Sequence, residues 1–278
     1  MLFRPRVVLL EDSSNLRIYG ARPYRLVVLH GGPGAGGEMA PVARELATDW
    51  GILEPQQTAA SIQGQVSELH DVIRGKADIP VVLIGWSWGA TLGFIFAAHY
   101  PRLVTGLVLV SSGPFRAEYA ADIMAIRQRR LPKALSQEVA SLMIVLQNPA
   151  AIGEDDALRR FGEIMTQADS YDPLPPDEGP VSVRYDIYHP VSEEAARLRS
   201  SGELLRLGTQ IACPVVAIHG DYDPHPWQGV AEPLAEVIGD FRLIRLSRCG
   251  HQPWRERLAR DDFYLRLRDE ITAALPSD

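Results

Sequence analysis

A serine with the features of a nucleophile lies in the stretch GWSWG, residues 85–89, directly after the apolar run VVLI. A residue at a sharp strand-to-helix turn is held in a strained backbone conformation that costs about 1–3 kcal/mol. Flanking glycines relieve the crowding where helix and strand cross, and the turn presents the serine oxygen at the end of the sheet. The next N–H, at the helix N-terminus, can stabilise a developing oxyanion. The pattern predicts that Ser87 attacks a carbonyl carbon.

A base and a carboxylate follow later in the chain, within HGDYDPHP (219–226) and CGHQPW (249–254). A hydrolytic serine needs a base to take its proton and an acid to orient that base. His251 and Asp223 supply both, in the order Ser, Asp, His that accompanies a G-x-S-x-G turn. Asp221 is the rival carboxylate.

The stretch HGGPG, residues 30–34, is the third candidate part of a site. Its glycines allow backbone N–H groups to approach a ligand oxygen closely. We expect His30 to orient this loop and to have no chemical role.

The elements that must position these residues follow an alternating pattern. Apolar runs rich in β-branched residues predict four buried strands, at 24–30, 80–86, 106–112 and 214–220. Further strands are predicted at 51–55 and 240–246, and an edge strand at 6–10. Helices are predicted over 61–73, with Ser61 as N-cap, over 90–100, ended by Pro101, and over about 256–274. Strand and helix alternation predicts a mostly parallel sheet flanked by helices, with its site at the carboxyl ends of the strands.

Residues 114–205 interrupt this pattern with helix-like stretches and a proline-rich loop at 171–180. We expect them to form a mainly helical cap inserted in a core of residues 1–113 and 206–278. The apolar residues Leu142, Ile144, Val145 and Leu146 are expected to cover the site. The basic run RQRR at 127–130 is interpreted as a solvated helix face.

Together these motifs resemble the α/β-hydrolase fold, and the pairing of HGGPG with GWSWG is similar to the proline iminopeptidase branch. The resemblance covers residues 24–113 and 213–275. It implies that Ser87 is the nucleophile, His251 the general base and Asp223, three residues after Gly220, the orienting acid. It also implies an oxyanion hole made by the backbone N–H groups of Gly32 and Trp88. The chain departs from that branch at ILEPQQTAAS (52–61), where an Asp-Gln-Arg-Gly-type segment is usual.

The expected function is therefore a serine hydrolase acting through an acyl-enzyme on a small ester or amide, without metal or cofactor. Alternatives are a proline iminopeptidase-like aminopeptidase and a small-molecule receptor that keeps an unused triad. Glu193 and Glu194 are candidates to meet a substrate amine, or else a solvated helix start. Trp86, Trp227 and Trp254 are candidate pocket residues, and Trp88 is expected to form the pocket wall with Trp86 beside Ser87.

Another reading of HGDYDPH is a metal site of His219, Asp221, Asp223 and His225. Alternate side chains on a strand point apart, which argues against it.

Composition narrows the class of protein and its partners. The formal net charge of −7 argues against a nucleic-acid face, which needs clustered Lys and Arg. Two cysteines, Cys213 and Cys249, are too few for a disulfide scaffold, and we expect Cys249 to be a buried, inert thiol. No apolar stretch reaches the ~20 residues of a membrane span and no signal peptide is evident, so we expect a cytoplasmic protein. The oligomeric state is left open.

Overall fold

The computed structural model describes residues 15–148, 152–176 and 181–276. Within these residues a seven-stranded sheet has the order β1-β4-β2-β5-β6-β8-β9, with β1 antiparallel to β4 and the other neighbours parallel. Its strands are β1 (Leu16–Tyr19), β2 (Tyr24–Leu29), β4 (Gly51–Pro55), β5 (Val81–Trp86), β6 (Val104–Val110), β8 (Val215–Gly220) and β9 (Phe241–Leu246).

The six strands predicted from residue 24 onward are confirmed, whereas the edge strand predicted at 6–10 lies outside the described residues. The short edge strand β1 was not predicted.

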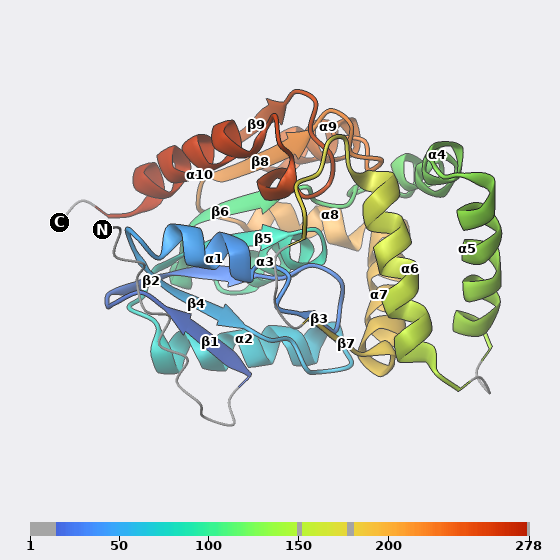
Figure 1. Ribbon diagram of the computed structural model, residues 1–278. Coiled ribbons are helices and arrows are strands. Elements are labelled where there is room, and N and C mark those ends of the chain that lie inside the picture. Colours follow the sequence, from blue (N-terminus) through green and yellow to red (C-terminus); the bar gives the residue numbers. More distant parts are fainter. Residues whose placement is uncertain (1–14, 149–151, 177–180, 277–278) are drawn as a thin grey trace.

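Helices cover both faces of this sheet (Figure 1). They are α1 (Ala40–Leu46), α2 (Ile62–Lys76), α3 (Trp88–His99), α9 (Gln228–Val237) and α10 (Arg260–Ala274). Successive residues of β2 enter opposite cores: Val27 and Leu29 pack with α2 and α3, whereas Leu26 and Val28 pack with α1 and α10. Burial on both faces explains why the strands are apolar runs without polar alternation.

Two helix boundaries bear on the predictions. The Ser61 hydroxyl accepts a hydrogen bond from the Gly64 N–H at 3.1 Å, so the predicted N-cap of α2 is confirmed. The C-terminal helix begins at Arg260 rather than near 256, because a short 3-10 helix, η4 (Pro253–Arg255), precedes it. The remaining 3-10 helices are η1 (Pro101–Leu103), η2 (Ala117–Ala120) and η3 (Gly208–Gln210).

Between β6 and β8 the described residues form five α-helices. They are α4 (Ile123–Arg130), α5 (Lys133–Leu146), α6 (Glu154–Asp169), α7 (Tyr185–Ser200) and α8 (Glu203–Leu207). The α4, α5 and α6 helices lie away from the sheet, at the right of Figure 1, whereas α8 packs beside α3. The α8 helix spans residue 205, at which the insertion was expected to end.

The helices of this segment pack in two different ways. A small separate core that includes Leu131, Val139 and Ile164 joins α5 to α6. By contrast, Ile187 and Val191 of α7 belong to the main core together with α2 and α3. The segment is thus part outer helices and part core.

The expectation that α5 covers the site is wrong for Ile144, whose side chain is 71% exposed. In Figure 1, α5 is the outermost helix and lies on the far side of α6 from the sheet. Packing on α6 leaves the outer face of α5 in water.

A two-stranded sheet ties the same segment to the glycine loop. In it β3 (Ala35–Gly36) pairs antiparallel with β7 (Ser182–Val183), and the Arg184 N–H donates to the Gly34 carbonyl at 3.1 Å. Among the described residues, none of the helices has both the length and the apolar character that a bilayer span requires.

Candidate active site

Ser87 lies at the turn between β5 and α3 with φ 53° and ψ −113°. A Cβ on Gly85 would lie 2.2 Å from the Gly89 carbonyl oxygen, and one on Gly89 would lie 2.3 Å from the Leu29 carbonyl oxygen. Such contacts are impossible for any larger residue, so both glycines are required by the close crossing of helix and strand. The Ser87 N–H donates to the Val110 carbonyl at 3.0 Å, while its side chain does not cap α3.

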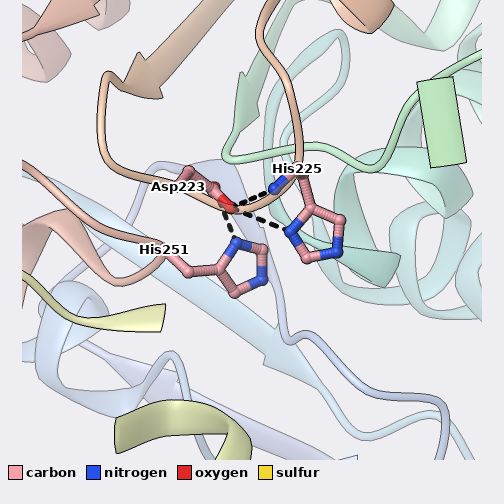
Figure 2. A group of neighbouring side chains, drawn as sticks. All are labelled: Asp223, His225 and His251. Carbon is pink, nitrogen blue, oxygen red and sulfur yellow. Dashed lines mark hydrogen bonds and ion pairs between the residues drawn. The ribbon is translucent and has the colours of Figure 1, made fainter. Parts of the chain in front are cut away.

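Asp223 and His251 come from the loops after β8 and β9 and meet in a direct hydrogen bond. The His251 Nδ1 donates to Asp223 Oδ2 at 2.7 Å (Figure 2). Asp221 does not take part, since its Oδ1 accepts from the Cys249 N–H at 3.3 Å. The two carboxylates that the sequence offered therefore have different partners.

Two further histidines surround the same carboxylate. Asp223 Oδ1 accepts from both the backbone N–H of His225, at 2.9 Å, and its Nδ1, at 2.8 Å. His219 Nε2 lies 3.4 Å from Asp223 Oδ2 and donates to the His225 carbonyl at 2.8 Å. From the sequence these histidines were candidates only for a metal site, and their contact with Asp223 was not predicted.

Burial and neighbouring charges shift the pKa values of Asp223, His225 and His251 in different directions. Burial alone would raise the pKa of Asp223, but the neighbouring His251, His225 and His219 hold it well below its usual range. Burial lowers the pKa of His225 to about 4, so this imidazole is neutral near pH 7. Burial also opposes the charged form of His251, yet the Asp223 carboxylate raises the pKa of His251. Of the two imidazoles that donate to Asp223, His251 is the better base.

The tryptophans occupy different surroundings. Trp86 donates from Nε1 to the His251 carbonyl at 2.8 Å, and its ring centroid lies 5.3 Å from that of His251 and 5.1 Å from that of Trp254. Trp88 instead donates to Gln65 Oε1 of α2 at 2.9 Å. Trp86 and Trp254 thus support the His251 loop, while the Trp88 indole packs in the main core.

Trp227 lies beside a charged side chain. The Arg245 guanidinium of β9 stacks over its ring, 4.3 Å from the ring centroid. The Trp227 ring thus contacts the edge strand β9, whereas the Trp86 ring contacts both His251 and Trp254.

The glycine loop is held by a buried histidine. His30 accepts from the Gln57 N–H at Nε2, 3.2 Å away, so its Nδ1 carries the proton and donates to the Gly31 carbonyl at 2.7 Å. Burial lowers the pKa of His30 to about 4, which keeps the ring neutral. These contacts agree with the expected loop-orienting role. Gly32 has φ 38°, a conformation that favours glycine.

Glu38, which lies in the turn after the glycine loop, was not predicted from the sequence. Its Oε2 lies 3.9 Å from the position that a Cβ on Gly32 would take. Burial raises the pKa of Glu38 to about 7, against the opposing effect of the His251 and Arg255 charges. A carboxyl group therefore lies beside the predicted oxyanion loop, and no sequence motif marks its position.

Two acidic residues that contact the His251 loop were also not predicted, one through its carboxylate and one through its backbone carbonyl. The buried Glu256 accepts from the N–H groups of Gly250, Tyr171 and Asp172 at 2.8–3.0 Å. The carbonyl of Asp169, the last residue of α6, accepts from the His251 N–H at 3.0 Å. The end of α6 and the segment after it are therefore bound to the His251 loop and to Glu256 through backbone groups, which side-chain patterns do not reveal.

The basic run at 127–130 is not a simple solvated face. Arg127 makes two hydrogen bonds to the Asp169 carboxylate, at 2.8 and 2.6 Å, and both side chains are largely buried. Arg130 stacks on the Tyr222 ring at 3.7 Å and donates to the Ala168 carbonyl. The interpretation as a solvated face is wrong for Arg127 and Arg130.

The glutamates considered as amine ligands are engaged elsewhere. Glu194 Oε2 accepts from the Ile62 N–H at the start of α2, 2.8 Å away. Glu193 is exposed and lies near His189 and Arg197. Cys249 is fully buried, and burial raises the pKa of its thiol, as expected for an inert cysteine.

The chain is similar to known esterases and lipases in sequence. It is 24% identical over 242 residues to the pimeloyl-[acyl-carrier protein] methyl ester esterase of Chromobacterium violaceum, which covers 82% of this chain and 87% of that protein. It is 26% identical over 202 residues to the human monoacylglycerol lipase ABHD6, covering 71% of this chain and 57% of the lipase.

Solved structures share the fold at lower identity. The crystal structure of VinJ superposes with a TM-score of 0.64 at 18% identity and covers 94% of this chain and 95% of its own. The monoacylglycerol lipase of Paleococcus ferrophilus gives a TM-score of 0.60 at 15% identity, with 95% and 100% covered. The family description "alpha/beta hydrolase fold" matches residues 68–254, well over half of the chain. The chain therefore belongs to the α/β-hydrolase fold family.

Proposed function

We propose that the protein is a serine hydrolase that cleaves small esters through an acyl-enzyme, with Ser87 as nucleophile, His251 as general base and Asp223 as orienting acid. The observation that carries this proposal is the 2.7 Å hydrogen bond from His251 Nδ1 to Asp223. That bond places the proton on Nδ1 and leaves Nε2 free to accept a proton from the serine.

In this mechanism Ser87 Oγ attacks the ester carbonyl while His251 Nε2 takes its proton. The backbone N–H groups of Trp88 and Gly32 donate to the oxyanion, and His251 returns the proton to the leaving alcohol. Water activated by His251 then hydrolyses the acyl-enzyme. The start of α3 at Trp88 and the left-handed backbone of Gly32 support this assignment.

Residues 114–205 are proposed to act as a cap on this site. The support comes from α4 and α6 rather than from α5: the Asp169 carbonyl contacts the His251 loop, and Arg127 holds the Asp169 side chain. Trp86 and Trp254 are proposed to form the pocket wall beside His251.

An ester is favoured over an amide by the relatives, because both curated proteins are named for ester substrates or lipase activity. The proline iminopeptidase-like alternative has less support, since Glu193 and Glu194 lie outside the site. The remaining alternative is a small-molecule receptor with an unused triad. Such a protein would have the same fold but would not hydrolyse ester substrates.

The test is a comparison of chromogenic substrates with wild type and Ser87→Ala. We expect wild type to hydrolyse p-nitrophenyl acetate and butyrate but not prolyl-p-nitroanilide, and we expect Ser87→Ala to lose at least ~10³-fold in kcat. Preference for the anilide would support the aminopeptidase. Absence of turnover on all three substrates would contradict the esterase and favour the receptor.

A further inference from the structure

The two oxygens of Asp223 each hold a different imidazole. His251 Nδ1 lies 2.7 Å from Oδ2, and His225 Nδ1 lies 2.8 Å from Oδ1. The two rings lie close together, with centroids 4.5 Å apart and a tilt of 30°. Figure 2 shows both rings on the same side of the carboxylate, each turning its Nδ1 towards it. The proposed hydrolysis needs only His251, so His225 is a second imidazole without a part in it.

These three side chains form a compact set of ligands. One carboxylate oxygen and one nitrogen from each ring all lie within 4.8 Å of one another. Zinc binds imidazole nitrogen at about 2.0–2.1 Å and carboxylate oxygen at about 2.0–2.2 Å, so its tetrahedral ligands are roughly 3.3 Å apart. The present N···O contacts of 2.7 and 2.8 Å would have to widen by roughly half an ångström to admit the ion.

We propose that Asp223, His225 and His251 form an inhibitory site for Zn²⁺ and similar transition-metal dications. The ion binds both Nδ1 atoms and a carboxylate oxygen. As it enters, each neutral ring loses its Nδ1 proton to solvent and takes one from solvent at Nε2, so both imidazoles stay neutral. The His251 and His225 side chains are 11% and 14% exposed, which allows a water to reach the fourth position. The two-nitrogen, one-oxygen set favours zinc over Mg²⁺ and Ca²⁺, which prefer oxygen ligands in larger number.

The loop that carries His225 is already ordered for this geometry. Its backbone N–H donates to Asp223 Oδ1 at 2.9 Å, and its carbonyl accepts from His219 Nε2 at 2.8 Å. Pro224 and Pro226 flank it and restrict its backbone. Outer hydrogen bonds of this kind orient metal ligands and strengthen metal binding.

Inhibition follows because the ion takes the Nδ1 atom that donates to Asp223. With Nδ1 bound to metal, His251 loses the hydrogen bond that orients it as a base. This consequence depends on the proposed hydrolase function, whereas binding of the ion does not.

The experiment measures Co²⁺ and Zn²⁺ binding directly and separately from activity. The full-length protein, stripped of metals, is titrated with Co²⁺ by visible absorption and with Zn²⁺ by calorimetry. The same titrations follow for His225→Phe, which keeps a ring but no ligand, and for His189→Phe, whose exposed histidine lies on α7. His225→Gln replaces His225→Phe if the latter does not fold.

We expect one ion per chain with the absorption of tetrahedral Co²⁺, and affinity at least ~10-fold weaker in the His225 variant but unchanged in His189→Phe. Mg²⁺ and Ca²⁺ should not compete. Equal affinity in the His225 variant and wild type, or no binding by wild type, would overturn the site.

Zinc inhibition of ester hydrolysis is then compared in the same proteins, and its inhibition constant should follow the affinities. Metal binding that depends on His225 in a protein without esterase activity would uphold the site and contradict the proposed function. Esterase activity that zinc does not inhibit would uphold the function and overturn the inhibitory role.

Discussion

The Asp223 carboxylate is buried among imidazoles, whereas Asp221, two residues earlier, is exposed and bonded to a backbone N–H. Asp223→Asn should lower kcat by roughly 10³–10⁴-fold, because an amide in that position favours the wrong His251 tautomer. Asp221→Asn is the matched control and should stay within a few-fold of wild type. Steady-state ester hydrolysis measures both, and a reversed order would mean that Asp221 is the acid.

Glu38 should make stability depend on pH. Because burial raises the pKa of its carboxyl from 4.5 to about 7, the folded protein binds this proton more tightly than the unfolded chain. The resulting stabilisation is complete below pH 4.5 and is lost as pH rises through 7.

Glu38→Gln removes this titration. We expect the Tm of the variant minus that of wild type to be more positive at pH 8 than at pH 5, as measured by calorimetry. A difference that does not change between these two values would show that Glu38 titrates normally.

Some of these residues were predictable and others were not, for a physical reason. Ser87 lies in a local motif whose glycines are required by the crossing of strand and helix, and Asp223 and His251 follow strands that the hydrophobic pattern predicts. Glu38 and Glu256 lie in no such pattern, and Glu256 acts on backbone N–H groups about 85 residues away in the chain. Their roles depend on loop conformations that only the fold defines.

At the scale of elements, the end of α6 is the part that links the segment between β6 and β8 to the loop of His251. Asp169 accepts from His251 through its carbonyl and binds Arg127 through its carboxylate, and both side chains of this pair are largely buried. Asp169→Ala leaves the Arg127 guanidinium buried without its partner. We expect a loss of about 3–5 kcal/mol in the free energy of unfolding, measured with urea.

The control for this prediction lies on the same helix. Glu163 forms an exposed ion pair with Arg160, so Glu163→Ala should leave the free energy of unfolding close to that of wild type. Similar losses in the two variants would contradict the importance of the buried pair.

The strand pattern predicted the sheet from residue 24 onward because burial on both faces makes those strands uniformly apolar. The edge strand β1 was missed because it is only four residues long and half-buried, so it shows neither an apolar run nor clear alternation. The position of α5 was predicted wrongly for a related reason. An amphipathic pattern predicts that a helix packs against another element, but it does not predict which element.

For the whole molecule, the segment between β6 and β8 has an outer part, α4 to α6, and a part packed in the main core, α7 and α8. The outer face of α5 is therefore expected to be dispensable. Ile144→Glu replaces a side chain that is 71% exposed, so ester hydrolysis and Tm should both stay close to wild type. A marked loss of activity would indicate that α5 moves over the site during turnover.

The central claim is that Ser87 is the nucleophile of a serine hydrolase, and covalent labelling tests it most directly. Wild type and Ser87→Ala are incubated with a fluorophosphonate, the intact mass is measured, and the modified peptide is sequenced by mass spectrometry. We predict a single adduct on Ser87 in wild type and none in Ser87→Ala, with both proteins folded by circular dichroism. An adduct on another residue, equal labelling of the variant, or no labelling of folded wild type would contradict the claim.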